Sequence, residues 1–174
     1  TRLVVAADSR FSNTRRQLGI SADSHDYGRT VLVFRTEHEI SNEATAFECF
    51  HYGRTLALLP LSSHMTNCVI TANHQTAKRL LALSPAALAQ DMAQQLQGRL
   101  GKMQVISSVH QYPLVGVHAR HFQAKRGVLI GDAAVGMHPV TAHGFNLGLE
   151  SACSLGELLQ QAAAKQQDIA AKSL

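Results

Sequence analysis

The 174-residue sequence has no tryptophan, only three tyrosines and six phenylalanines, and charged residues make up just 16% of it. Sixteen Lys and Arg against twelve Asp and Glu leave a net charge of +4. Nucleic-acid binding needs a longer basic stripe interleaved with stacking aromatics, so the sequence disfavours that class of partner. An average soluble domain is about 25% charged. The low charge therefore indicates that part of the surface faces something other than water.

Long apolar runs and paired cysteines are also absent. The longest apolar run, Leu56–Leu61, is far shorter than the roughly 20 residues of a membrane-spanning helix. The three cysteines lie at wide spacing without a C-x-x-C pair, which predicts reduced thiols in a cytoplasmic protein. No signal peptide is expected, because Thr1 is followed by neither a basic region nor a cleavage site. With 45% apolar residues the chain can still bury a sizeable core.

Several catalytic motifs are missing as well. No G-x-S-x-G is present, which excludes a serine hydrolase elbow, and no G-x-x-x-x-G-K-[ST], which excludes a P-loop phosphotransferase. No G-x-G-x-x-G follows a strand, so a full dinucleotide-binding unit is not expected. His118 and His121 have the spacing of one helical turn, but no third ligand follows at a suitable spacing. The sequence therefore predicts no metal site.

Two short apolar runs are each followed by an acidic residue. Leu3–Ala7 stops at Asp8, and Gly127–Ile130 stops at Gly131 and Asp132. Such runs are typical of parallel strands buried on both faces, and ligands of open α/β sheets bind beyond the carboxyl ends of the strands. The pattern favours a cofactor site at these ends. The alternative is that both aspartates only cap the next turn.

The segment between these runs alternates as an antiparallel sheet does and then becomes helical. Strands are predicted at 30–36, 46–51, 55–61, 67–71 and 102–112, and helices at 76–83 and 85–100. Ser84 followed by Pro85 is a helix-start signal. Gly101 is expected to end that helix, and Pro113 is expected to end the last strand.

A further helical pattern begins at Gly144, directly after the loop 139–143, and keeps an apolar face to Ala162. A helix N-terminus offers unpaired N–H groups and about half a positive charge, which suit an anionic ligand. Strand, acid, glycine-bearing loop and helix start thus follow one another between Val128 and Asn146. The tail 160–172, rich in Gln, Ala and Lys, is expected to be a fraying helix.

Three blocks of the sequence resemble one family. Gly127–Glu150 resembles the second FAD-binding motif of the flavin-dependent aromatic hydroxylases, most closely of their ubiquinone-biosynthesis branch. Val5–Ile20 is similar to the family's middle motif, which contacts both the flavin and the nicotinamide nucleotide. Tyr52–Leu61 resembles a strand pair of the family's substrate domain. The resemblance spans nearly all of the chain.

The resemblance implies a mixed α/β (α+β) fold, part of a para-hydroxybenzoate-hydroxylase-like FAD-binding fold with an antiparallel substrate-domain sheet. Residues 1–28 and 122–174 would belong to the FAD domain, and residues 29–121 to the substrate-binding domain. Asp132 would bind the ribityl chain, Pro139 would lie beside the isoalloxazine ring, and the backbone of 144–146 would face the pyrimidine edge of that ring. The residues implied for FAD binding are Asp8, Gly131, Asp132, Pro139, Gly144, Phe145 and Asn146. No catalytic residue is assigned.

The implied activity is an FAD- and NAD(P)H-dependent monooxygenase that uses dioxygen to hydroxylate a phenolic, polyprenylated ring in ubiquinone biosynthesis. The missing fingerprint predicts a middle-to-C-terminal fragment that lacks its own N-terminal part and is inactive alone. A cytoplasmic location is expected, and peripheral association with the inner membrane would suit an enzyme of prenylated rings. The alternative is a non-catalytic α/β binding module for an apolar ligand or a partner protein, which the missing fingerprint and the low charge support.

The sequence departs from the family pattern at several positions. Ser9 stands where the middle motif usually has Gly, Val135 where a His is common, and Ala142-His143 where the branch commonly has Gly-Gln. His138 and His143 flank the predicted flavin loop, where they would either tune a proton or pack the loop. The basic group of Arg10, Arg15 and Arg16 would either meet nucleotide phosphates or form a solvated face.

Overall fold

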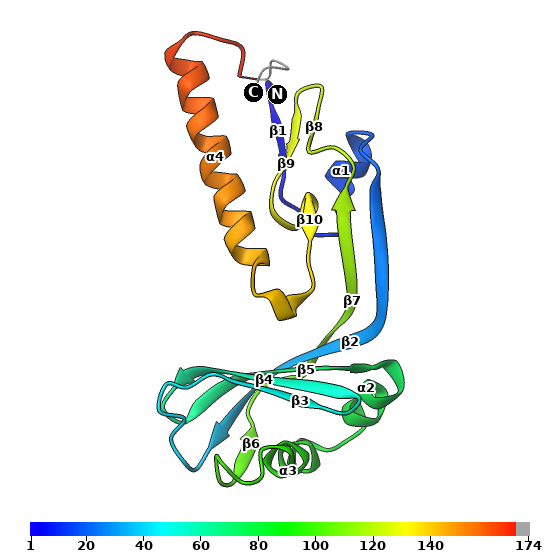
Figure 1. The fold of residues 1–174 in the computed structure, drawn as a ribbon, viewed down its shortest axis with the longest axis vertical. Coiled ribbons are helices and arrows are strands. Elements are labelled where there is room, and N and C mark those ends of the chain that lie inside the picture. The colour runs from blue at the N-terminus through cyan, green and yellow to red at the C-terminus, as the bar shows by residue number, and fades with distance from the viewer. Residues whose placement is uncertain (170–174) are drawn as a thin grey trace. The chain divides into compact units, whose positions relative to one another are not determined.

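The structure, a computed structural model, describes residues 1–169 (Figure 1). The chain divides into two compact units. Unit 1 combines Thr1–Tyr27 with the residues from Val115 onward, and unit 2 is the continuous segment Gly28–Leu114. Two strands, β2 (Ala22–His38) and β7 (His110–Ala119), carry the chain across the two boundaries between the units.

Unit 2 is an antiparallel sheet with helices on one face. Its strands follow the order β2, β5, β4, β3, and β6 also pairs with β2. The bounds are β3 Phe47–His51, β4 Arg54–Ser62, β5 Met65–Asn73 and β6 Met103–Val105. In register, Leu32 lies opposite Ile70, and Ile70 lies opposite Leu56. The side chains of these three residues face the helices, because they form one buried core cluster with residues of α2 and α3.

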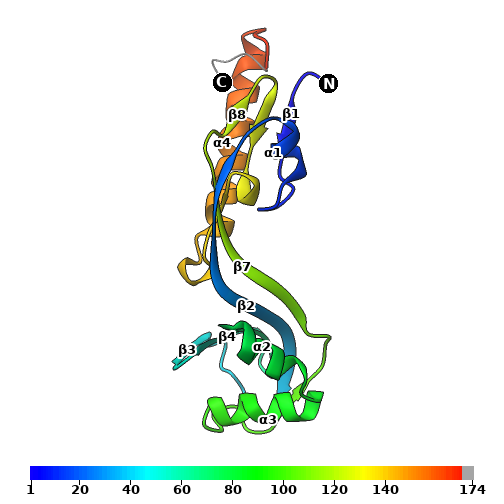
Figure 2. The ribbon, with the colours of Figure 1, turned by 90° about the vertical axis from the view of Figure 1, so that its right-hand side faces the viewer.

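In unit 2, α3 begins at its predicted signal, whereas α2 begins two residues before its predicted range. Helix α2 (His74–Leu81) is capped by the Asn73 side chain, and α3 (Pro85–Gln95) by the Ser84 side chain, each accepting a hydrogen bond from a backbone N–H three residues on. Helix α3 lies along one side of the sheet in both views (Figure 1 and Figure 2). Its Leu88 and Met92 are buried against the sheet core, so the predicted apolar stripe does pack there.

The end of α3 comes earlier than the sequence predicts. Gln97 and Gly98 both have positive φ, at 53° and 72°. The Gly98 N–H donates to the Ala93 carbonyl oxygen at 2.9 Å, a bond that closes a helix C-terminus in a Schellman-type turn. The prediction that Gly101 ends the helix is therefore wrong. Leu96 and Leu100 are buried all the same, in the turns that follow the helix.

The predicted strand 102–112 is also wrong, because two separate strands, β6 and β7, take its place. Pro113 lies inside β7 and does not end it. Proline is tolerated in a strand wherever its nitrogen would face no acceptor on a neighbour. The other strands match the predicted ranges, although β2 begins well before Thr30.

Among the described residues of unit 2, no helix packs on the second face of its sheet, where apolar side chains lie beside Arg35 and Glu48. Val33 lies opposite Val69, and Val69 lies opposite Ala57, and all three are partly exposed. On the same face, Leu59 is 46% and Phe50 69% exposed. Water therefore reaches a band of aliphatic and aromatic side chains on this face.

Unit 1 holds a small sheet that joins its two distant segments. Strand β1 (Val4–Ala6) pairs in parallel with β9 (Gly127–Leu129), and β8 (Gln123–Ala124) pairs antiparallel with β9. Both predicted strands are confirmed. The expectation that β1 is buried on both faces is wrong, because Val4 and Val5 are 36% and 41% exposed and only Ala6 is buried. β1 is the outer strand of this sheet, so one of its edges has no strand beside it within residues 1–169.

Helix α4 (Gly144–Ala164) lies beside β1 and β9 in unit 1 (Figure 1). Ala162 is its one buried residue within the described chain, and Phe145, Leu149 and Leu158 are exposed. An open cleft of about 680 Å³ lies between α4 and β9, and Val128 and Leu155 are among its mostly apolar lining. Residues 165–169 continue the chain beyond α4, and the end of the predicted tail helix, 170–172, lies outside the described residues.

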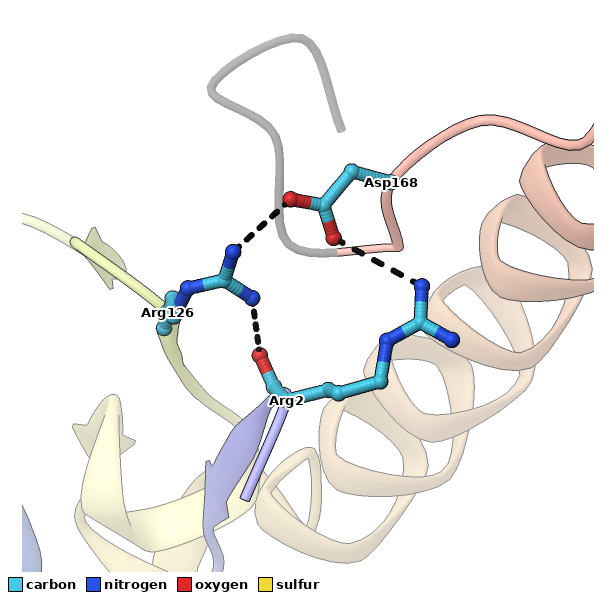
Figure 3. Close-up of polar contacts among 3 residues, drawn as sticks. All are labelled: Arg2, Arg126 and Asp168. Atoms are coloured by element: carbon cyan, nitrogen blue, oxygen red, sulfur yellow. Dashed lines mark hydrogen bonds and ion pairs between the residues drawn. The ribbon is translucent and has the colours of Figure 1, made fainter.

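Three charged side chains fasten the segment after α4 to the start of the chain (Figure 3). Arg126 donates to the Arg2 carbonyl oxygen and to the Asp168 carboxylate, both at 2.9 Å. A second nitrogen–oxygen approach of 3.8 Å joins Arg2 to Asp168. All three side chains are more than two-fifths exposed, so water weakens these ion pairs.

Candidate functional site

The first predicted site residue, Asp8, is a cap for the short helix α1 (Asn13–Gln17). Its carboxylate accepts hydrogen bonds from the Ser12 hydroxyl and from both the N–H and the hydroxyl of Thr14, the latter two at 3.0 Å. These bonds hold the pKa of Asp8 well below its usual range, chiefly through Ser12 and the Thr14 N–H. Asp8 therefore fixes the shape of the loop 8–14.

Ser9 follows in a backbone conformation that favours glycine. Its φ is +75°, in the left-handed region. The family motif usually has Gly here, and the structure shows the physical reason for that preference. The backbone of Ser9 adopts this conformation at a small cost in strain. The loop therefore keeps its shape although serine replaces the usual glycine.

An ion pair joins the two predicted motifs. Arg10, from the loop after β1, donates to the Asp132 carboxylate at 2.8 Å, and its other terminal nitrogen donates to the Val115 carbonyl oxygen at 2.9 Å. The side chains of Arg10 and Asp132 are 24% and 34% exposed. More than a hundred positions separate the two residues in sequence. The parallel pairing of β1 with β9 brings their following loops to the same sheet edge.

The other two arginines of the basic group also bind within unit 1. Arg15 is buried and donates to the Ala133 carbonyl oxygen at 2.8 Å. Arg16 donates to the Phe11 carbonyl oxygen and to the Asn13 side chain. Arg15 therefore does not form part of a solvated face, whereas Arg16 is exposed as that alternative expects. These bonds tie α1 to the residues around it.

Gly131 opens a short 3-10 turn, η1 (Gly131–Ala133), that packs on α4. Its φ is +56°, which favours glycine. The Gly131 N–H donates to the Ser151 hydroxyl, and that hydroxyl donates to the Gly148 carbonyl oxygen. A Cβ added to Gly148 would lie 3.5 Å from the Gly131 Cα. Two glycines therefore allow the turn that carries Asp132 to lie close to the first turns of α4.

The loop before α4 is held by His138. The Nδ1 of His138 accepts a hydrogen bond from the Val140 N–H at 3.2 Å and caps the 3-10 turn η2 (Pro139–Thr141). The Tyr27 ring packs edge-on against the His138 ring, with centroids 5.0 Å apart. His143 contacts the Thr141 carbonyl oxygen through Nδ1. Both histidines thus take part in loop packing, one of the two roles the sequence leaves open.

The N-terminus of α4 is open. Leu147 is the first residue to donate to a carbonyl at the helix start, that of His143, and the His143 side chain makes no cap. The N–H groups of Gly144, Phe145 and Asn146 therefore have no intrahelical acceptor. A Cβ at Gly144 would meet no atom within 4 Å, and Phe145 is 79% exposed. Together, the carboxylate of Asp132 and these three donors fit a ligand with hydroxyl groups and an anionic edge, such as FAD.

His118 and His121 are not brought together as a metal site. His118 packs against the Phe122 ring at 5.6 Å between centroids. Within residues 1–169, no group of three or more His, Cys, Asp or Glu is arranged to hold a metal ion. No helix of this described part is long and apolar enough to cross a bilayer.

Two features of the site could not be identified from the sequence. The Arg10–Asp132 pair depends on strand pairing over a long separation, and its one signal was the density of arginines around position 10. Tyr27 gave no signal beyond its aromatic character. It packs against His138 because Gly116 leaves room for its ring, whose hydroxyl lies 3.1 Å from where a Cβ of residue 116 would stand.

Solved structures with the same architecture include a probable FAD-dependent monooxygenase and a hydroxylase in complex with FAD. *Pseudomonas aeruginosa* PqsL in complex with 2-aminobenzoylacetate has a TM-score of 0.79 at 21% identity, over 97% of this chain and 48% of PqsL. Aklavinone-11 hydroxylase with FAD and aklavinone has a TM-score of 0.78 at 16% identity, over 93% of this chain and 31% of that chain. The predicted mixed α/β fold of the para-hydroxybenzoate-hydroxylase kind is confirmed.

Relatives by sequence include two ubiquinone hydroxylases. Ubiquinone hydroxylase UbiM of *Neisseria meningitidis* is 61% identical over 173 residues, which cover 99% of this chain and 38% of UbiM. Ubiquinone hydroxylase UbiL of *Rhodospirillum rubrum* is 34% identical, over 91% of this chain and 37% of UbiL. The chain thus spans about two-fifths of the length of these relatives. The model of a family described as FAD binding domain matches residues 1–169, and the chain belongs to that family.

Proposed function

We propose that this chain is part of an FAD-dependent monooxygenase that hydroxylates a phenolic, polyprenylated ring in ubiquinone biosynthesis. One observation carries the proposal: the ion pair of Arg10 with Asp132 joins the two loops that resemble flavin motifs, and the turn carrying Asp132 packs on the open start of α4. The 61% identity to a ubiquinone hydroxylase supports the substrate class.

FAD, reduced by NAD(P)H, would supply the redox chemistry that places one oxygen atom of dioxygen on the ring and releases the other as water. The Asp132 carboxylate would accept hydrogen bonds from ribityl hydroxyls. The N–H groups of Gly144, Phe145 and Asn146 would donate to the anionic edge of the reduced ring, at about 0.3–2 kcal/mol for each favourable contact. Pro139 and Gly131 would shape the loops on either side, and Asp8 would hold the loop that carries Arg10.

Residues 1–28 and 122–174 would form the FAD-binding part, and residues 29–121 the substrate-binding part. The helix-free face of the unit 2 sheet supports the second assignment, because Val33, Val69 and Phe50 offer an apolar surface to an aromatic ring or a prenyl chain. A bound apolar substrate would displace water from this face, and such oxidations need a water-poor site to avoid loss of the activated oxygen. A prenylated substrate would suit peripheral association with a membrane.

The experiment uses the product of the complete reading frame that encodes these residues, beside the 174-residue chain. We expect flavin absorbance between about 350 and 500 nm in the purified product, and rescue of a strain that lacks a ubiquinone ring hydroxylase. Asp132→Asn should weaken FAD binding. The matched control is Asp23→Asn, since Asp23 pairs with Arg120 on the exposed surface of the same unit. A flavin-free product that rescues no strain would refute the proposal.

A second candidate is a non-catalytic module for an apolar ligand, and the cleft between α4 and β9 favours it. That cleft has a volume of about 680 Å³ and is lined by Leu3, Val128 and Leu155 among others. Pockets of this size bind drug-sized apolar molecules. Saturable binding of a fluorescent fatty acid by the flavin-free product, lost in Leu155→Asp, would favour this function over the first.

A further inference from the structure

One oxygen of the Asp132 carboxylate accepts a hydrogen bond within the protein, and the other is available to a ligand. Its Oδ2 accepts the hydrogen bond from Arg10 at 2.8 Å. No partner for Oδ1 occurs among the described residues, and about a third of the side chain is exposed. A carboxylate has several lone pairs, so it can accept from Arg10 and from a ligand hydroxyl at the same time.

Arg10 is itself held from two sides. Its second terminal nitrogen donates to the Val115 carbonyl oxygen at 2.9 Å, so the guanidinium plane is fixed by two acceptors. Gly136 lies beneath the start of the side chain, where an added Cβ would come within 2.9 Å of the Arg10 Cβ. Gly136 belongs to the short strand β10 (Val135–Gly136) and pairs with Val117 of β7, so its backbone cannot move away freely. These contacts thus hold the Arg10 side chain in one conformation.

We propose that Arg10 is a positioning residue for FAD recognition: it fixes the rotamer of Asp132 so that the second carboxylate oxygen faces the ribityl hydroxyls. This inference rests on the proposed function and adds to it a residue that does not itself contact the cofactor. An acceptor that is already oriented loses less side-chain entropy when the ligand binds. Charge-assisted bonds of this length are about twice as strong as neutral ones, so they hold a side chain effectively.

The test measures the dissociation constant of FAD by its fluorescence quenching in the flavin-stripped product of the complete reading frame. We expect Arg10→Gln to raise the constant about tenfold, the usual effect of losing one charge-assisted hydrogen bond. Arg10→Lys should recover part of the affinity, since the ammonium keeps the charge without the two-acceptor fork. Thermal unfolding of the same flavin-free variants reports any loss of fold separately.

A double-mutant cycle separates positioning from direct contact. If Arg10 acts through Asp132, then Arg10→Gln combined with Asp132→Asn will bind FAD no more weakly than Asp132→Asn alone. If Arg10 instead contacts a phosphate of the cofactor, the two effects will multiply. Multiplying effects would overturn the inference.

Gly136→Ala provides a second variant that leaves both charges in place. Its new methyl group should displace Arg10 and weaken FAD binding in the same direction as Arg10→Gln. The matched control is Gly156→Ala in α4, where an added Cβ meets no atom within 4 Å. Unchanged affinity in both Arg10→Gln and Gly136→Ala would overturn the inference but leave the proposed function standing. A wild-type product that binds no FAD would instead refute the proposed function.

Discussion

Replacing Arg54 by alanine should destabilise unit 2 more than any exposed charge substitution. Arg54 begins β4 and donates to the Asp91 carboxylate of α3 at 2.7 Å. The Arg54 side chain is only 10% exposed, whereas Asp91 is 25% exposed. Breaking a fully buried pair costs about 3–5 kcal/mol, because one charge is left without a partner. Since water still reaches part of Asp91, we expect a smaller loss, of about 2 kcal/mol.

The assay is urea unfolding of the chain followed by circular dichroism, with hydrogen exchange of the peptide 85–95 as a local readout for α3. Arg54→Met with Asp91→Leu should recover most of the loss, because an apolar pair of similar volume leaves no buried charge. Asp23→Ala is the control, since the Asp23–Arg120 pair is more than three-fifths exposed on both sides. A loss below about 0.5 kcal/mol for Arg54→Ala, or additive effects in the Arg54 and Asp91 cycle, would refute the reasoning.

Four further predictions concern a core substitution, the pH dependence of stability, thiol reactivity and the independent folding of unit 2. Met92→Ala should cost about 2–5 kcal/mol in urea unfolding, because Met92 is fully buried and its loss leaves a cavity; an unchanged midpoint would contradict this packing. The native hydrogen bonds lower the pKa of Asp8, so its contribution to stability is present above the unfolded pKa of about 4 and is lost as pH falls; Asp8→Asn should flatten the acid limb of a stability–pH curve. Burial raises the pKa of the Cys68 thiol, whereas Cys153 is exposed, so a thiol reagent at pH 8 should label Cys153 first and Cys68 only in urea; equal labelling rates would argue against the buried core. The segment 28–114 should fold alone with cooperative unfolding, because its core lies within that continuous stretch; a segment that shows only a disordered spectrum would contradict this.

Local signals predicted most elements of unit 2 but not the two strands in place of 102–112, because such signals depend on residues close in sequence. Ser84 with Pro85 marks the start of α3, and Gly53, at φ +85°, lies in the turn between β3 and β4. The end of α3 was misplaced because Gln97 adopts the left-handed conformation beside Gly98. A sequence pattern gives little warning of a non-glycine residue in that region.

The sequence suggests separate parts of the candidate site but not the bond that connects two of them. Asp132, Gly131 and the start of α4 are proposed as site residues from strand, glycine and helix signals that lie within about 20 residues of one another. The bond between Arg10 and Asp132 needs a parallel strand pair whose members lie far apart in sequence. Periodicity reports the face of an element but not its partner, so such a bond follows only from the three-dimensional arrangement.

The interrupted layout of unit 1 bears on the order in which the chain folds. Val4 pairs with Gly127. The β1–β9 pair can therefore form only when a loop of roughly 120 residues closes. Unit 2 is synthesised in one piece between those strands, and its hairpins close over short distances. We therefore expect unit 2 to fold first. Strand β1 cannot pair with β9 until β9 has left the ribosome, and until then Val4 and Val5 are exposed to water. During that interval the edge of β1 that later pairs with β9 is available to chaperones, or to the same strand of another nascent chain.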